Sequence, residues 1–217
     1  MRNDESGPRI AYLLPTGRCN LHCQGCYATL EHWGRHTRKG ELSLEDYRRV
    51  IAELVDMNVR VFDISGGEPL LYRHLVEVCE AIRSHEGTRI WLVNNGTKLD
   101  AAKLERLSGL VERLVVSLDA PYADLHDELR GRKGTFDLAL STLRAARALP
   151  FPEVAVNMLV CRPNADSVGD MLALCRREEF DRLSLLSYRD VSENGVMPDM
   201  IPDFDALKRG WETAAEA

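Results

Sequence analysis

The sequence contains no apolar run of about 18 residues, the length that a membrane-spanning helix needs. Its first seven residues, MRNDESG, hold no apolar stretch of the signal-peptide type. Basic residues are not in excess, because 28 Lys and Arg stand against 34 Asp and Glu, and this balance predicts no basic surface for nucleic acid. Repeats, linkers and low-complexity stretches are also missing. We therefore expect a cytoplasmic protein without membrane or nucleic-acid partners.

What the sequence does contain is an alternation of short apolar runs and segments of helical period. Hydrophobic residues make up 45% and charged residues 29%, and 217 residues suit a single globular domain spanning 1–217. The apolar runs are rich in Val, Ile and Leu, which predicts parallel strands covered on both faces. We expect strands at 10–14, 59–64, 89–93, 114–118, 154–160 and 183–187, and helices at 44–55, 72–84, 101–107, 136–149, 166–179 and 204–215.

Six strand–helix units in succession predict an α/β fold with a parallel sheet and helices on its outside. A closed barrel of eight units typically needs about 250 residues. We therefore expect an open, partial (β/α)6 barrel whose sixth unit spans 182–217. A dinucleotide-binding sheet would carry G-x-G-x-x-G after its first strand, but this chain has PTGRC at 15–19, which excludes that alternative.

Three of the six cysteines lie in the longest connection, residues 15–42. Cys19, Cys23 and Cys26 have the spacing C-x3-C-x2-C, and in a reducing compartment clustered cysteines more often hold metal than form disulfides. Three thiolates leave two alternatives open, an iron–sulfur cluster or a zinc ion with a histidine as its fourth ligand. The candidate histidines are His22, His32 and His36.

A second motif, SGGEP at 65–69, follows directly on the second predicted strand. Paired glycines let backbone approach a ligand closely, and the glutamate offers a charged acceptor to an amino group. Alone, the motif would equally suit a turn before a helix. Because the carboxyl ends of parallel strands meet at one edge of a sheet, we expect this motif and the cysteines to share a site.

Together the two motifs resemble the radical S-adenosylmethionine (radical SAM) superfamily, and the resemblance extends over residues 10–187. It implies a [4Fe–4S] cluster with one iron open to S-adenosylmethionine. Many members add a C-terminal auxiliary-cluster (SPASM-type) domain, and from the length of this chain we expect a core domain without one. The implied cluster ligands are Cys19, Cys23 and Cys26. The residues implied to lie beside the amino group of the cofactor are Gly66, Gly67, Glu68 and Pro69.

Weaker matches extend the implied cofactor site along the later strands. NNGT at 94–97 resembles a T-N-G turn, SLD at 117–119 resembles an S-x-D element, and Arg130 matches a downstream arginine whose planar fork suits a carboxylate. Gly25 departs from the family, which usually has an aromatic residue there, and Tyr27 is the expected substitute. Residues on the fifth and sixth strands either contact the cofactor or fill the barrel. These matches add Tyr27, Asn94, Ser117, Asp119, Arg130, Asn157 and Leu185 to the expected cofactor site.

The other cysteines lie apart from the cluster loop. Cys79 and Cys175 fall on predicted helices and are expected to be buried structural thiols. Cys161 follows the fifth strand at the active end of the barrel, where it is a candidate catalytic residue that donates a hydrogen atom to a substrate radical.

The resemblance implies a radical SAM enzyme that forms a 5′-deoxyadenosyl radical and removes hydrogen from its substrate. The expected substrate is a peptide or a small molecule such as a sugar or nucleoside, and the expected electron donor is of the flavodoxin or ferredoxin type. The alternative is a non-catalytic module that uses zinc or an iron–sulfur cluster for binding or redox sensing.

Overall fold

A computed structural model describes residues 9–26, 40–98, 100–188 and 197–216. Its six strands are all parallel and form one sheet in chain order. The strands are β1 (Ile10–Leu13), β2 (Val61–Ile64), β3 (Arg89–Asn94), β4 (Arg113–Ser117), β5 (Glu153–Val160) and β6 (Arg182–Ser187). The helices are α1 (Leu44–Asp56), α2 (Leu75–Arg83), α3 (Ala101–Ser108), α4 (Ala123–Arg130), α5 (Thr135–Arg147), α6 (Val168–Arg177) and α7 (Phe204–Glu216), with short 3-10 turns η3 (Pro69–Leu71), η4 (Arg162–Ser167) and η5 (Pro198–Met200).

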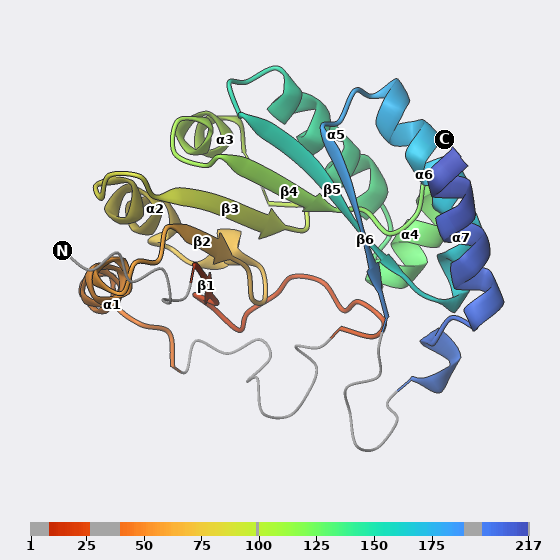
Figure 1. Cartoon of the computed structure of the whole chain (residues 1–217), viewed down its shortest axis with the longest axis horizontal. Coiled ribbons are helices and arrows are strands. Elements are labelled where there is room, and N and C mark those ends of the chain that lie inside the picture. The colour runs from red at the N-terminus through yellow and green to blue at the C-terminus, as the bar shows by residue number, and fades with distance from the viewer. Residues whose placement is uncertain (1–8, 27–39, 99, 189–196, 217) are drawn as a thin grey trace.

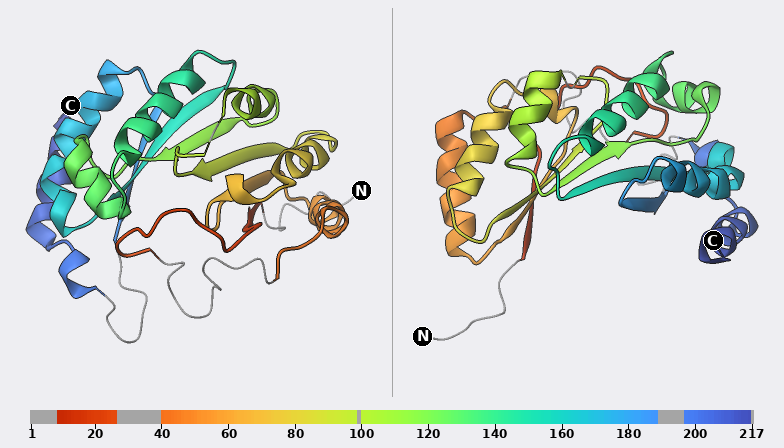
Figure 2. Two further views of the ribbon diagram at one scale, coloured as in Figure 1. Left: turned by 180° about the vertical axis from the view of Figure 1, so that it is seen from behind. Right: turned by 90° about the horizontal axis from the view of Figure 1, so that it is seen from above.

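The sheet curves into a half-barrel with its helices on the outer face (Figures 1 and 2). The hydrophobic core lies between the sheet and these helices, and every second residue of a strand contributes to it. On β5, for example, Val154, Val156, Met158 and Val160 belong to the core. This arrangement confirms the predicted open (β/α)6 barrel, with chain-order strands because each crossover helix returns to the same face.

Local sequence signals explain where the helices begin and end. Ser43 and Asp46 form the capping box at the start of α1, as their spacing predicts. Gly131, with φ of 67°, ends α4 in the left-handed conformation that glycine adopts easily. None of the helices in the described ranges is long and apolar enough to cross a membrane.

Helix α4 is an eight-residue helix that the predicted elements do not include. It offers only two leucines to the core side of an otherwise polar segment, so its helical period is weak. Asp127 on α4 accepts hydrogen bonds from Thr135 Oγ1 (2.8 Å) and Phe136 N (2.9 Å), which caps α5 in place of its own N-cap residue, Gly134. The chain therefore places two helices between β4 and β5.

The prediction that the strands are covered on both faces is wrong for the two edge strands. Tyr12 on β1 is 70% exposed and Leu186 on β6 is 50% exposed, because an open barrel leaves the inner face of its edges without a facing sheet. The inner face also carries charge: the Arg113 guanidinium lies 4.1 Å from the ring of Trp91 and its Nε lies 2.7 Å from Glu153 Oε2. The apolar runs in the sequence did not indicate that charged side chains lie on this face.

Candidate active site

The three clustered cysteines lie in a loop that follows β1 and passes over the carboxyl edge of the sheet (Figure 1). Burial raises the pKa of the Cys19 thiol, and the charges of Glu68, Cys23 and Cys26 raise it further, against a hydrogen bond from the Leu21 backbone. Burial likewise raises the pKa of Cys23. The three thiols are therefore close enough to interact electrostatically. Each would lose its proton on binding a metal centre.

This set of donors suits an iron–sulfur cluster, which binds through cysteine thiolates. In the ranges that the structure describes, no three His, Cys, Asp or Glu side chains converge to hold one metal ion. His22 lies in that part of the chain, whereas His32 and His36 lie outside it. A cluster presents a separate iron to each thiolate, so its ligands need not converge on one point. The residues present therefore fit the cluster that the three cysteines predict.

The loop after β2, residues 65–69, packs against the cysteine loop through its two glycines. Gly67 N donates to Thr16 O (2.9 Å) and Glu68 N donates to Arg18 O (2.7 Å). A Cβ atom at Gly67 would lie 2.2 Å from the Arg18 carbonyl oxygen, and one at Gly66, whose φ is 122°, would lie 3.0 Å from Thr16 O. The close backbone approach predicted for the glycines is thus an approach to the cysteine loop itself.

The carboxylate of Glu68 joins two neighbouring turns. Its side chain is 1% exposed, with Oε1 accepting from Leu70 N (3.0 Å) and Oε2 from Asn95 N (2.9 Å). Burial raises its pKa to about 7, although the two backbone hydrogen bonds favour the charged form. Glu68 therefore fixes the segment that begins η3 at Pro69 to the turn after β3.

The turn after β3 meets the cysteine loop through Asn95, which was not among the predicted site residues. Asn95 Nδ2 donates to Asn20 Oδ1 at 3.0 Å. The predicted residue, Asn94, is buried, and its amide donates to Val115 O on β4 (3.0 Å) and accepts from Gly96 N within the turn (2.8 Å). The NNGT motif located the turn correctly, but the contacts with the loop come from Asn95 and from Thr97, whose Oγ1 accepts from Asn20 Nδ2 at 2.8 Å.

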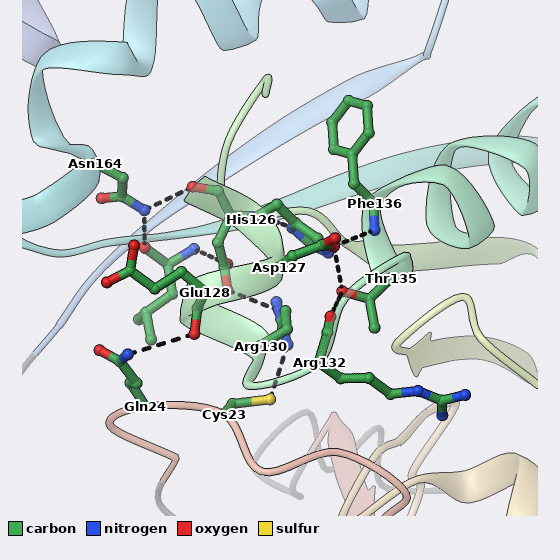
Figure 3. Close-up of polar contacts among 12 residues, drawn as sticks. Cys23, Gln24, His126, Asp127, Glu128, Arg130, Arg132, Thr135, Phe136 and Asn164 are labelled. Carbon is green, nitrogen blue, oxygen red and sulfur yellow. Dashed lines mark hydrogen bonds and ion pairs between the residues drawn. The ribbon is translucent and has the colours of Figure 1, made fainter. Parts of the chain in front are cut away.

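Arg130 at the end of α4 forms an ion pair with Asp119, which follows β4, and a hydrogen bond to Cys23 in the cysteine loop (Figure 3). Arg130 Nε lies 2.8 Å from Asp119 Oδ2, and Arg130 Nη1 lies 3.8 Å from Cys23 Sγ. The charge of Arg130 opposes the effect of burial on the pKa of Cys23. The structure thus brings together three residues that the sequence placed in one site from three separate motifs.

Two buried polar residues that sequence reasoning missed hold Asp119 in place. Asp119 N donates to His126 Nδ1 (3.1 Å), and Asn164 Nδ2 donates to Asp119 O (2.7 Å). His126 and Asn164 are each 1% exposed. The histidine lies four residues before Arg130, and that match was the one available signal. Asn164 stands beyond β5 and carried none.

His126 should make the protein less stable in acid. Burial, with a smaller contribution from the Arg130 charge, lowers its pKa to about 3, so below pH 6.5 the unfolded chain binds a proton that the folded chain does not. Down to that pKa, the free energy of unfolding falls by about 1.4 kcal/mol per pH unit from this group alone. In His126→Asn, Oδ1 can still accept from Asp119 N but does not titrate. Urea unfolding should show that the free energy of unfolding falls more between pH 6.5 and pH 5.0 in wild type than in His126→Asn. Equal losses in the two proteins would contradict the lowered pKa of His126.

Further contacts hold the middle of the cysteine loop. Gln24 N donates to Leu129 O at 2.8 Å. Gly25, with φ of 66°, leaves room for the ring of Tyr188, which would be 2.5 Å from a Cβ atom at that position. Tyr188 at the end of β6 thus occupies the space beside Gly25, whereas the expected aromatic substitute, Tyr27, lies outside the described residues.

The later strands present a polar row to the inner face of the half-barrel. Ser117, Asn157 and Ser184 are partners in register on β4, β5 and β6. Leu185, which the resemblance also implied as a cofactor contact or as barrel filling, pairs with Met158 and packs against the core. It stands one residue along β6 from Ser184, and neighbouring residues of a strand face opposite sides of the sheet.

The isolated cysteines are buried. Cys79 and Cys175 belong to the main core, as predicted, and burial raises the pKa of each to about 12. Cys161 is 1% exposed in a small apolar cluster with Leu129 and Tyr188, and burial raises its pKa to about 12 as well. The structure therefore places Cys161 near the site but packs its thiol among apolar side chains.

Residues 13–175 match the radical SAM superfamily. The chain belongs to this superfamily. The cofactors of this superfamily are a [4Fe–4S] cluster and S-adenosylmethionine, and the cysteine loop of this chain fits the cluster. A family match of this extent also makes the zinc alternative unsupported.

Curated relatives include the GTP 3′,8-cyclase of Geobacter sulfurreducens, 34% identical over 175 residues, which are 79% of this chain and 53% of the relative. Another is the mycofactocin maturase MftC of Mycolicibacterium smegmatis, 32% identical over 165 residues, 75% of this chain and 40% of the relative. The chain spans about half the length of the curated relatives it matches.

Among solved structures, Streptococcus suis SuiB bound to S-adenosylmethionine superimposes with a TM-score of 0.82 at 18% identity, covering 97% of this chain and 48% of SuiB. SuiB bound to its precursor peptide SuiA gives a TM-score of 0.83 at 19% identity, with 97% and 46% covered. At these identities the likeness establishes the half-barrel fold.

Proposed function

We propose that this chain is the catalytic core of a radical SAM enzyme that removes a hydrogen atom from a peptide or from a small molecule such as a sugar or nucleoside. The observation that carries the proposal is the docking of the cysteine loop: the glycines of 65–69, the turn after β3 and the end of α4 all hold it at the carboxyl edge of the sheet. When bound, the cluster and S-adenosylmethionine supply one-electron cleavage to a 5′-deoxyadenosyl radical.

The residues of the chain bind and orient these groups. Cys19, Cys23 and Cys26 hold the cluster, and the backbone of Gly66 and Gly67 forms the wall beside it. Glu68 keeps that wall in place through its two backbone hydrogen bonds, and each of its oxygens retains acceptor capacity for an amino group.

Arg130 provides the second contact to the cofactor. Its Nε faces Asp119 and its Nη1 faces Cys23, which leaves donors of its five-proton fork for the carboxylate of S-adenosylmethionine. Ser117 and Asn157, on the inner face of the sheet, are also proposed to contact the cofactor, on the side nearer the substrate. Asp119 acts by positioning Arg130. Cys161 is left out of this machinery because its thiol is packed in an apolar cluster.

The side of the half-barrel between its edge strands β1 and β6 is the proposed entrance for the substrate, since Tyr12 and Leu186 on these strands are exposed. Similar proteins support both proposed substrate classes. The structural neighbour SuiB was solved with a precursor peptide, and a curated relative is a GTP 3′,8-cyclase. We place the protein in the cytoplasm, where its six free thiols and a flavodoxin- or ferredoxin-type electron donor are expected.

The test is anaerobic reconstitution with iron and sulfide, followed by dithionite and S-adenosylmethionine. We expect about four irons per chain, as [4Fe–4S] requires, and release of 5′-deoxyadenosine measured by liquid chromatography. A colourless protein that binds one zinc ion and releases none would favour the non-catalytic module instead. Candidate peptides and nucleosides are then ranked by how much each increases that release.

A further inference from the structure

The guanidinium of Arg130 lies between a carboxylate and a predicted cluster ligand (Figure 3). It is 2.8 Å from Asp119 Oδ2 through Nε and 3.8 Å from Cys23 Sγ through Nη1. The side chains of Arg130 and Asp119 are only 13% and 8% exposed. Because buried charges are screened less by salt and water than exposed ones, both act on the Cys23 sulfur more strongly than surface charges at the same distances would.

The surrounding protein fixes this arrangement from several sides. Asp119 Oδ1 accepts from Leu159 N at 3.0 Å, which orients the carboxylate toward Arg130. The backbone of Asp119 is held by His126 Nδ1 and Asn164 Nδ2, at 3.1 and 2.7 Å. Each of these contacts comes from a different element, so the ion pair cannot drift without breaking buried hydrogen bonds.

We propose that Arg130 raises the reduction potential of the cluster held by Cys19, Cys23 and Cys26, and that Asp119 moderates this effect. The inference rests on the proposed function, since it requires a cluster at these cysteines. Reduction adds one electron and no proton to the cluster, so negative charge increases beside the guanidinium, which stabilises the reduced state. Cluster potentials respond to net charge and to hydrogen bonds on the sulfurs, and Arg130 supplies both to Cys23.

The proposal predicts shifts of opposite sign for the two partners. With the reconstituted protein in the absence of S-adenosylmethionine, the reduced cluster is quantified by electron paramagnetic resonance at a series of mediator-poised potentials. Arg130→Gln should lower the ratio of reduced to oxidised cluster at a given potential by about tenfold, equivalent to about 59 mV for one electron. Asp119→Asn keeps an acceptor for Leu159 N, removes the negative charge and should raise the ratio.

Two further variants serve as controls. Arg132→Gln removes a cation two residues away whose side chain is exposed, and its ratio should equal that of wild type. Arg130→Lys keeps the positive charge without the planar fork, and its ratio should lie between those of wild type and Arg130→Gln. Iron content and circular dichroism are recorded for every variant.

Each outcome decides one question. A wild-type protein that takes up no four-iron cluster overturns the proposed function and this inference with it. The inference alone is overturned if the wild-type protein holds the cluster and Arg130→Gln leaves its reduction potential unchanged. It is also overturned if Arg130→Gln and Asp119→Asn shift the potential in the same direction. If Arg130→Gln takes up no iron, Asp119→Asn decides, because a raised ratio supports the proposal and an unchanged or lowered ratio refutes it.

Discussion

Replacing Cys23 with alanine should abolish cluster assembly and reduce 5′-deoxyadenosine release to background. Cys23 is one of three thiols in the loop after β1, and two thiolates cannot hold a cluster that needs three protein ligands. The substitution also removes the sulfur that faces the buried Arg130 guanidinium, which leaves that charge with Asp119 as its remaining ionic partner in the described site. Iron analysis and the visible absorbance of the reconstituted protein measure the first effect, and liquid chromatography measures the second.

The matched control is Cys79→Ala, which deletes the same atom from a cysteine far from the site. Cys79 is fully buried on α2, and burial raises its pKa to about 12, so its thiol is not available as a ligand. This variant should keep about four irons per chain, as the unaltered ligand set requires. If Cys23→Ala retained those irons and the wild-type rate, the assignment of Cys23 as a ligand would be wrong.

The fold was predictable because its signal repeats along the chain. Six apolar runs separated by helical segments specify a parallel sheet with outer helices, and the strand bounds agree to within two residues of those observed. Helix α4 escaped detection because its helical period is weak, and tertiary contacts stabilise it: Leu129 O accepts from Gln24 N, and Asp127 caps the next helix. Contacts of this kind have no local pattern in the sequence.

The site was predictable only where neighbouring residues form a motif. The cysteines and the SGGEP segment identify the two loops that meet, since parallel strands bring their carboxyl ends together. Asn164 and Asp119 are 45 residues apart, and their hydrogen bond depends on how η4 packs beneath the end of β4. Leu185 illustrates a different limit: periodicity of two locates a strand, but one residue of register decides which face a side chain occupies, and the side chain of Leu185 packs against the core.

Gly67→Ala should inactivate the enzyme although it leaves all three cysteine ligands of the cluster in place. A Cβ atom there would lie 2.2 Å from Arg18 O and 2.8 Å from the carbonyl carbon of Gly17, and both are backbone atoms that cannot rotate away. The loop must therefore separate from the segment that leads directly into Cys19, breaking the hydrogen bond from Gly67 N to Thr16 O.

Overpacking and the lost hydrogen bond together should lower the free energy of unfolding by about 2–4 kcal/mol. Displacement of the cluster loop by about 1 Å should slow 5′-deoxyadenosine release by roughly 100-fold. Urea unfolding and single-turnover assays measure the two quantities. Gly109→Ala is the matched control, because no atom lies within 4 Å of its added Cβ and its φ of −84° suits alanine. If Gly67→Ala behaved like Gly109→Ala in both assays, the two loops would not be docked as the structure shows, and the glycines would have to act on the cofactor directly.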